Sequence, residues 1–171
     1  YKIIISINKK KKFFFVKSIF ENNLKNILAA ITVISIFKDI DKLNKNIFYK
    51  FKTLKGRGDI SKIKIKRKVI KFIDESYNAN PLSVRSAIKN FDLIKKGSSE
   101  KNLILSDMLE LGKHSKKLHK NLAKDINSSK IDKVYVYGNN IKHTFNKIIP
   151  KKRGLILKDK NQIISLIKNN I

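Results

Sequence analysis

The chain of 171 residues contains no cysteine and no tryptophan, and it has only two prolines. Without cysteine it can form no disulfide framework, no thiol nucleophile and no cysteine-ligated metal centre. A composition that is 42% hydrophobic and 31% charged is typical of a folded globular protein. The length is enough for one full domain and part of a second, with a sizeable core.

Long apolar runs are also missing. The longest nearly apolar run covers residues 27–37, whereas a membrane-spanning helix needs about 18 residues or more. The apolar start at residues 3–5 is too short for the core of a signal peptide. We therefore expect no membrane span. Since the chain begins with Tyr1 rather than Met, we expect it to be a piece of a longer protein.

Acidic residues are scarce: 13 Asp and Glu stand against 40 Lys and Arg, for a net charge of +27. Such an excess is typical of proteins that bind nucleic acids or anionic membranes. However, only four of the cations are arginine, the residue best suited to bidentate phosphate and base contacts. Lys, Ile and Asn, whose codons are A/T-rich, make up nearly half of the chain. Compositional drift is the favoured interpretation, and functional basicity is the alternative.

Residues 1–65 predict a hairpin, two helices and a strand. The hairpin has strands at 2–7 and 13–19 around a lysine-rich turn at 8–12. Apolar residues at helical spacing predict helices over 22–37 and 39–51. Gly56 and Gly58 then break the pattern, and a strand follows at 60–65.

From about residue 68 strands and helices alternate. Strands are expected at 69–74, 102–106, 133–137 and 155–157, and the helices that follow them at 81–96, 115–128, 140–148 and 160–170. Four such units with short connections predict an α/β fold with a Rossmann-like, doubly wound, mainly parallel sheet. Sheets of this kind carry their sites at the carboxyl ends of strands, so the loops after residues 74, 106 and 137 are the candidates. A domain boundary is expected near 58–68.

The loop after the first of these strands reads DESYNANP over residues 74–81. A helix start accounts for Asn80 as the N-cap and Pro81 as the first helical residue. It does not account for the adjacent carboxylates of Asp74 and Glu75, which can accept hydrogen bonds from a ribose. A plain helix start and a nucleotide site both stay open on the residues alone.

The loop after the next strand reads SDMLELG over residues 106–112, and neighbouring loops of a parallel sheet share one crevice. Asp107 lies in this loop and His119 on the helix that follows. His114 and His119 are five residues apart, so they do not form the i, i+4 pair of a helical metal site. No zinc site is expected, and His119 is a candidate for facing the crevice.

A third candidate is the turn Gly56–Arg57–Gly58 near the domain boundary. It is either a solvated turn or a means of delivering a guanidinium to a phosphate. The chain contains no GxxxxGK[ST] phosphate loop, and it also lacks the GxGxxG, HExxH and GxSxG motifs.

Taken together, these segments resemble the Mur ligases. The match consists of four motifs in order, NNLKNILAA at 22–30, GR at 56–57, DESYNANP at 74–81 and SDMLELG at 106–112, with His119 on the next helix. The SYNANP string is typical of the branch that adds D-Ala-D-Ala. Asn22 stands where the family often has His, and Ser106 where it has Gly.

The resemblance implies a division of the chain into two incomplete domains. Residues 1–58 would be the end of the central ATP-binding domain, and 59–171 the C-terminal domain without its last strand. The family's phosphate loop lies earlier in the central domain. The chain would therefore be truncated at both ends and inactive by itself.

The resemblance also implies roles for individual residues. Asn26, and with it Asn23, would contact adenine, and Arg57 would reach the terminal phosphates as the catalytic cation. Asp74 or Glu75 would bind ribose, and which of the two acts stays open. The peptide substrates would meet at Asn78, Asn80, Asp107 and His119. No metal ligand is expected in this part of the protein.

The implied reaction is ATP-dependent amide formation in the bacterial cytoplasm, with Mg²⁺ held mostly by residues outside the chain. The substrates would be a UDP-N-acetylmuramoyl (UDP-MurNAc) tripeptide and D-Ala-D-Ala, and the enzyme is expected to be a monomer with no nucleic-acid partner. One alternative is another amide ligase of the superfamily, such as one that adds glutamate to folate. The other is a basic nucleic-acid-binding α/β module.

Overall fold

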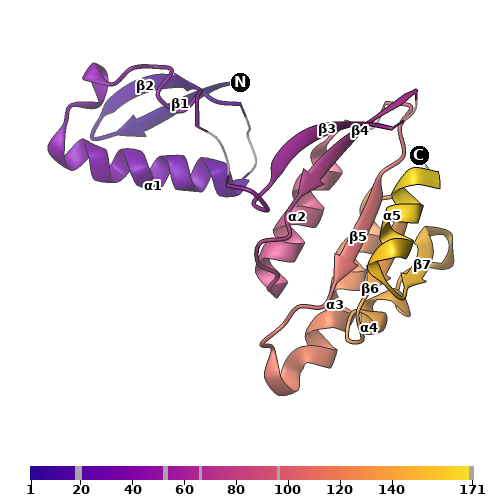
Figure 1. The fold of residues 1–171 in the computed structure, drawn as a ribbon. Helices are drawn as coiled ribbons and strands as arrows, with labels where there is room; N and C mark the ends of the chain where they lie inside the picture. The colour runs from indigo at the N-terminus through magenta and orange to yellow at the C-terminus, as the bar shows by residue number, and fades with distance from the viewer. Residues whose placement is uncertain (18–20, 52–53, 66, 96, 170–171) are drawn as a thin grey trace. The chain divides into compact units, whose positions relative to one another are not determined.

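The computed structural model describes residues 1–17, 21–51, 54–65, 67–95 and 97–169 (Figure 1). The chain divides into two compact units, Tyr1–Thr53 and Leu54–Ile171. Each unit has a hydrophobic core of its own.

The first unit is a β-hairpin with a helix. Strands β1 (Lys2–Ile7) and β2 (Lys10–Phe15) pair antiparallel, and helix α1 (Glu21–Phe37) follows. Its core is formed by four buried side chains from both strands, the helix and the segment after it: Ile5, Phe14, Ile31 and Ile40. The predicted hairpin and first helix are confirmed, although β2 covers residues 10–15 rather than the expected 13–19, of which 18 and 19 lie outside the described residues.

Two details of the first unit differ from the prediction. The hairpin turn needs only Asn8 and Lys9, because both have positive φ, 50° and 65°, as a tight two-residue turn requires. The expected helix over 39–51 is wrong. A short 3₁₀ helix, η1 (Ile40–Lys42), stands there and is followed by turns. Asp39 accepts a hydrogen bond from the Asp41 amide at 3.0 Å, and such side-chain bonds compete with helix formation.

The second unit combines a hairpin with a parallel sheet. Strands β3 (Asp59–Ile65) and β4 (Lys68–Asp74) pair antiparallel. Strands β5 (Asn102–Ser106), β6 (Lys133–Tyr137) and β7 (Arg153–Leu157) form a parallel sheet in that order. The helical elements are α2 (Pro81–Leu93), η2 (Gly112–His114), α3 (Ser115–Ser128), α4 (Lys142–Phe145), η3 (Pro150–Lys152) and α5 (Lys160–Asn169).

The predicted α/β class with a Rossmann-like parallel sheet is confirmed, but β4 has a different partner from the one expected. Among the described residues β4 pairs with β3, and Ile65 lies opposite Lys68. Pairing strands so close in sequence closes only a short loop, which costs little chain entropy. Residues 69–74 therefore belong to a hairpin in the structure rather than to the three-stranded parallel sheet.

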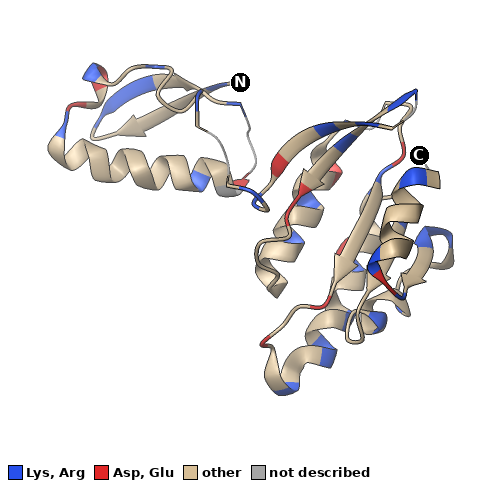
Figure 2. Cartoon of the chain, in the orientation of Figure 1, with Lys and Arg blue, Asp and Glu red and all other residues tan. Residues whose placement is uncertain are grey.

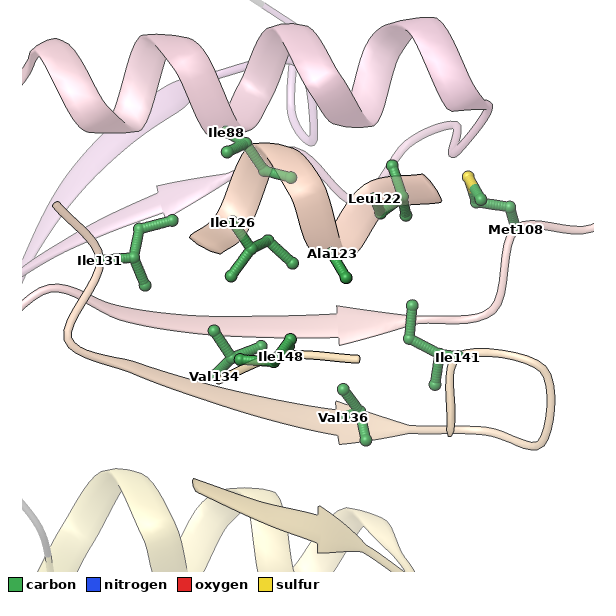
Figure 3. Packing of buried hydrophobic residues seen from close by; sticks show 10 residues of the cluster. All are labelled: Ile88, Met108, Leu122, Ala123, Ile126, Ile131, Val134, Val136, Ile141 and Ile148. Atoms are coloured by element: carbon green, nitrogen blue, oxygen red, sulfur yellow. The ribbon is translucent and has the colours of Figure 1, made fainter. Parts of the chain in front are cut away.

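The parallel sheet is covered on both faces. Val134 and Val136 of β6 are fully buried on the side of α3, where Leu122 and Ile126 pack (Figure 3). On the other face Tyr135 packs with a cluster that includes Leu157 and Leu166. Alternate residues of β6 thus face opposite layers, as the doubly wound prediction requires.

The ends of several elements are shifted from the expected positions. Helix α2 stops at Leu93 rather than near 96, α4 is shorter than the predicted 140–148, and β7 begins two residues early. Residues 96 and 170 lie outside the described residues. Within those that are described, no helix is both long and apolar enough to cross a membrane.

Candidate functional site

The glycine–arginine turn lies against the loop that follows β4. The Gly58 amide donates to the Asp74 carbonyl at 2.7 Å, and the Tyr77 amide donates to the Gly56 carbonyl at 3.0 Å. Gly56 and Gly58 have φ values of +75° and +81°, a region that favours glycine. A Cβ on Gly56 would also lie 2.9 Å from the Tyr77 nitrogen. The turn therefore needs both glycines, and it fixes Arg57 beside the acidic loop.

Arg57 is held by an aromatic ring. Its guanidinium carbon lies 4.2 Å from the centre of the Tyr77 ring. A cation–π contact at an exposed site contributes about 0.5–1 kcal/mol. Both side chains are exposed, so the guanidinium is oriented and yet accessible to an anion.

Three carboxylates surround the same turn. Asp59 accepts from the Gly56 amide at 2.7 Å, and Asp74 accepts from the Ser76 amide at 2.9 Å. The Glu75 carboxylate faces Gly58, where a Cβ would lie 3.0 Å from its Oε1 atom. Partial burial and the nearby charges of Asp74 and Asp59 raise the pKa of Glu75.

The two asparagines of this loop differ in what they bind. Asn80 is the N-cap of α2, because its Oδ1 accepts from the Leu82 and Ser83 amides at 3.0 and 2.9 Å. Ser83 closes the capping box by accepting from the Asn80 amide at 3.0 Å. Helix capping therefore occupies the side-chain oxygen of Asn80, whereas the Asn78 side chain is exposed.

Asp107 directly follows β5, and His119 lies on α3, where its ring contacts the loop after β5. Asp107 accepts from the Asn139 amide at 3.0 Å and from the Ile141 amide at 2.7 Å. The His119 ring is fully buried, and its Nε2 accepts from the Met108 amide at 3.0 Å. Both side chains thus bind backbone within the second unit.

Asn23 and Asn26 lie on α1, in a different compact unit from Arg57 and its neighbours. Asn26 is exposed and Asn23 half-buried. Over the described ranges, no three His, Cys, Asp or Glu side chains come together as a metal site.

Two residues beside the turn, Tyr77 and Asp59, are not among the site residues predicted from the sequence. The signal for Asp59 was its position next to Gly58, where a carboxylate can bind the turn's own amides. The Arg57–Tyr77 contact could not be found, because it depends on two segments that meet only after folding.

The second unit is thus an α/β domain in which a guanidinium and three carboxylates gather around the turn at residues 56–58. Residues 61–171 match the family model described as "Mur ligase, glutamate ligase domain". The chain therefore belongs to the Mur ligase family, and the resemblance seen in the motifs is confirmed.

Curated relatives carry one activity name, UDP-N-acetylmuramoyl-tripeptide–D-alanyl-D-alanine ligase. The Bacillus subtilis protein is 30% identical over 73% of this chain, and the chain covers 26% of that protein. The Rickettsia prowazekii protein is 30% identical over 81% of the chain, which covers 28% of it. The chain thus spans little more than a quarter of the length of these relatives.

Solved structures share the fold. MurF from Acinetobacter baumannii superposes with a TM-score of 0.78 at 21% identity, over 99% of this chain and 36% of that one. The MurF ligase from Thermotoga maritima, solved in complex with ADP, superposes with a TM-score of 0.77 at 22% identity. The superposition covers 98% of this chain and 36% of that one.

Proposed function

We propose that the chain is part of an ATP-dependent amide ligase that joins D-Ala-D-Ala to a UDP-MurNAc tripeptide during the synthesis of peptidoglycan precursors. The observation that carries the proposal is the pairing of the Arg57 turn with the Asp74–Tyr77 loop inside one unit. The names of the curated relatives support the particular substrates. ATP and a UDP-linked substrate are cytoplasmic nucleotides, so the cytoplasm is the proposed location.

The proposed roles follow from what each side chain offers. Arg57 is accessible, always charged and oriented by Tyr77, so it is suited to neutralise phosphate charge. Glu75 is the proposed ribose acceptor, because one oxygen of Asp74 already accepts from the Ser76 amide. Asn78 remains a candidate for substrate binding, since its side chain is exposed.

In the proposed reaction the γ-phosphoryl group of ATP moves to the terminal carboxylate of the tripeptide, and ADP leaves. The amine of D-Ala-D-Ala then attacks the acyl carbon, loses a proton and displaces phosphate, so that an amide forms. The task of the protein is to hold the reacting groups together and to neutralise the phosphate charge. In the second unit Arg57 would neutralise phosphate charge and Glu75 would hold the ribose. Asn23 and Asn26 on α1 are proposed to contact adenine.

The test is phosphate release by the protein expressed from the complete reading frame. We expect release with ATP, the UDP-MurNAc tripeptide and D-Ala-D-Ala together, and none when glutamate replaces the dipeptide. Release with glutamate and a folate acceptor would instead identify another ligase of the superfamily. The 171-residue chain alone is the matched control, and we expect it to release no phosphate.

A nucleic-acid-binding role would rest on the excess of Lys and Arg alone. Lys and Arg are scattered over strands, helices and loops of both units (Figure 2). We expect no binding to a DNA or RNA oligonucleotide at physiological salt. Tight binding there, weakening steeply as the salt concentration rises, would support the nucleic-acid-binding alternative.

A further inference from the structure

The loop after β5, residues 107–111, is fixed by a histidine that no solvent reaches. His119 is 0% exposed and Met108 1% exposed. Because the His119 Nε2 accepts from the Met108 amide, the ring proton is on Nδ1, which faces the Ser115 carbonyl at 2.8 Å. Both ring nitrogens are thus used inside the protein. The Thr144 hydroxyl donates to the His119 carbonyl at 2.7 Å and ties α4 to the same point.

The start of this loop is also fixed to the loop after β6. Asp107 accepts from the Asn139 and Ile141 amides, so one carboxylate spans the two strand ends. Figure 3 shows Met108 and Ile141 on the segments that leave these strands. Gly138 has a φ of +132°, and a Cβ there would lie 2.5 Å from the Asp107 Oδ1 atom. The two loops therefore pack closely, with no room for a side chain at position 138.

The fixed loop presents two exposed residues in an unusual backbone shape. Leu109 is 73% exposed. Glu110 follows it with a φ of +60°, which costs a residue other than glycine about 1–2 kcal/mol. Such a conformation persists only where the surroundings determine it. The hydrogen bonds that Asp107 and His119 make on the amino-terminal side of Glu110 hold the loop in this conformation.

We propose that His119 is a positioning residue, which fixes the loop 107–111 through the Met108 amide, and that it makes no contact with substrate. A substrate could reach its ring nitrogens only after the hydrogen bonds to Met108 and Ser115 were broken. The consequence for peptide ligation rests on the proposed function, whereas the structural role does not. In that role His119 holds the loop 107–111 in one conformation before a substrate binds, which lowers the entropy cost of binding.

Two substitutions of His119 separate the contact made by Nε2 from the contact made by Nδ1. In His119→Gln the side-chain amide extends to the position of Nε2 and can still accept from the Met108 amide. In His119→Asn it extends only to the position of Nδ1, so it can still donate to the Ser115 carbonyl but leaves the Met108 amide buried without a partner. Both variants are neutral and polar, so they differ mainly in the contact that the proposal concerns.

Amide hydrogen exchange of the 171-residue chain measures this contact. We expect the Met108 amide to exchange about tenfold or more faster in His119→Asn than in the wild type, since a buried hydrogen bond contributes about 1–1.5 kcal/mol. His119→Gln should restore slow exchange. The Val136 amide in β6 reports on global opening, and the acceleration at Met108 in His119→Asn should exceed any acceleration at Val136. Equal protection of Met108 in all three proteins, or equal loss in both variants, would overturn the proposal.

A measurement on the wild type alone covers the case in which a variant does not fold. Nitrogen NMR of the His119 ring should find the proton on Nδ1, with a scalar coupling from the Met108 amide nitrogen to Nε2. A proton on Nε2 would contradict the assignment.

Activity of the complete protein links the contact to function. His119→Asn should lower kcat/KM for D-Ala-D-Ala about tenfold or more, and His119→Gln should recover most of it. If the ring instead bound substrate, both variants would lose activity alike while Gln kept Met108 protected. If the wild type shows no such ligation, the proposed function fails, and the exchange and NMR results still decide the positioning role.

Discussion

Glu75 shares its turn with two other carboxylates, and these neighbours control its proton. Its folded-state pKa is raised by partial burial and by the charges of Asp74 and Asp59. A raised pKa means that the folded protein holds this proton more tightly than the unfolded chain. The stabilising contribution is therefore present below the ordinary value of 4.5 and is lost as the pH rises through the folded-state pKa.

Glu75→Gln should remove this pH dependence. We expect the free energy of unfolding of the variant to exceed that of the wild type at pH 7. Near pH 4 this difference should shrink or disappear. Denaturant unfolding at the two pH values measures the difference. Glu100→Gln, at another exposed acid of the same unit, is the matched control. A Glu75→Gln advantage that is the same at both pH values would contradict the raised pKa.

At the scale of single residues, the sequence predicts which loops carry candidate side chains but not the contacts that these side chains make. Arg57, Asp74 and Glu75 stood out because they occupy unusual loops. The stacking of Arg57 on Tyr77 and the burial of His119 depend on segments that are distant in sequence. Two of the lysines are buried: Lys101 and Lys152 are 4% and 7% exposed. Composition cannot tell these two from the solvated majority.

Those two lysines explain where two helices end. The Lys101 Nζ donates to the carbonyls of Phe91 and Asp92 at 3.0 and 2.7 Å, at the end of α2. The Lys152 Nζ donates to three carbonyls at the end of α3, those of Ile126, Asn127 and Ser129. The last carbonyls of a helix have no partner within it, and a cation there also interacts favourably with the helix dipole. Each lysine thus terminates a helix from a distant position in the sequence.

Lys152→Met should destabilise the second unit by about 1–2 kcal/mol, because it leaves buried carbonyls without a donor. Keeping the Lys152 charge away from water is itself costly, so burial lowers the pKa of Lys152, and removing the charge recovers part of the loss. The shift of the denaturation midpoint measures the effect. Lys151→Met, at the exposed neighbour, should change the midpoint little. Equal shifts in the two variants would contradict the capping role.

Elements with regular apolar spacing were predicted well, and elements decided by local polar contacts were not. Strands β5 and β6 and helices α1 and α3 have the expected bounds to within one residue. The helix expected over 39–51 failed because Asp39 and Asn44 accept bonds from amides two residues ahead. The pairing partner of β4 was also predicted wrongly, because the apolar pattern of a strand does not show which other strand pairs with it.

At the scale of the whole molecule, the chain consists of two compact units that contribute different candidate groups. The first holds Asn23 and Asn26, and the second holds Arg57 with the acidic loop. The division at residue 53 lies a few residues before the expected domain boundary at 58, and the assignment of residues 1–58 to a central ATP-binding domain stays a proposal. The family match begins at residue 61 and covers the second unit to its end.

The central claim is that Arg57, oriented on its turn by Tyr77, acts on the phosphates of ATP. Its most direct test is the turnover of Arg57→Ala in the complete protein, with Arg67→Ala as the control at another exposed arginine of the same unit. We expect kcat to fall about 100-fold or more for Arg57→Ala, because the loss of one charge-stabilising donor has an effect of that size. The KM for ATP should change far less, and Arg67→Ala should behave as the wild type. Unchanged turnover in Arg57→Ala would contradict the account.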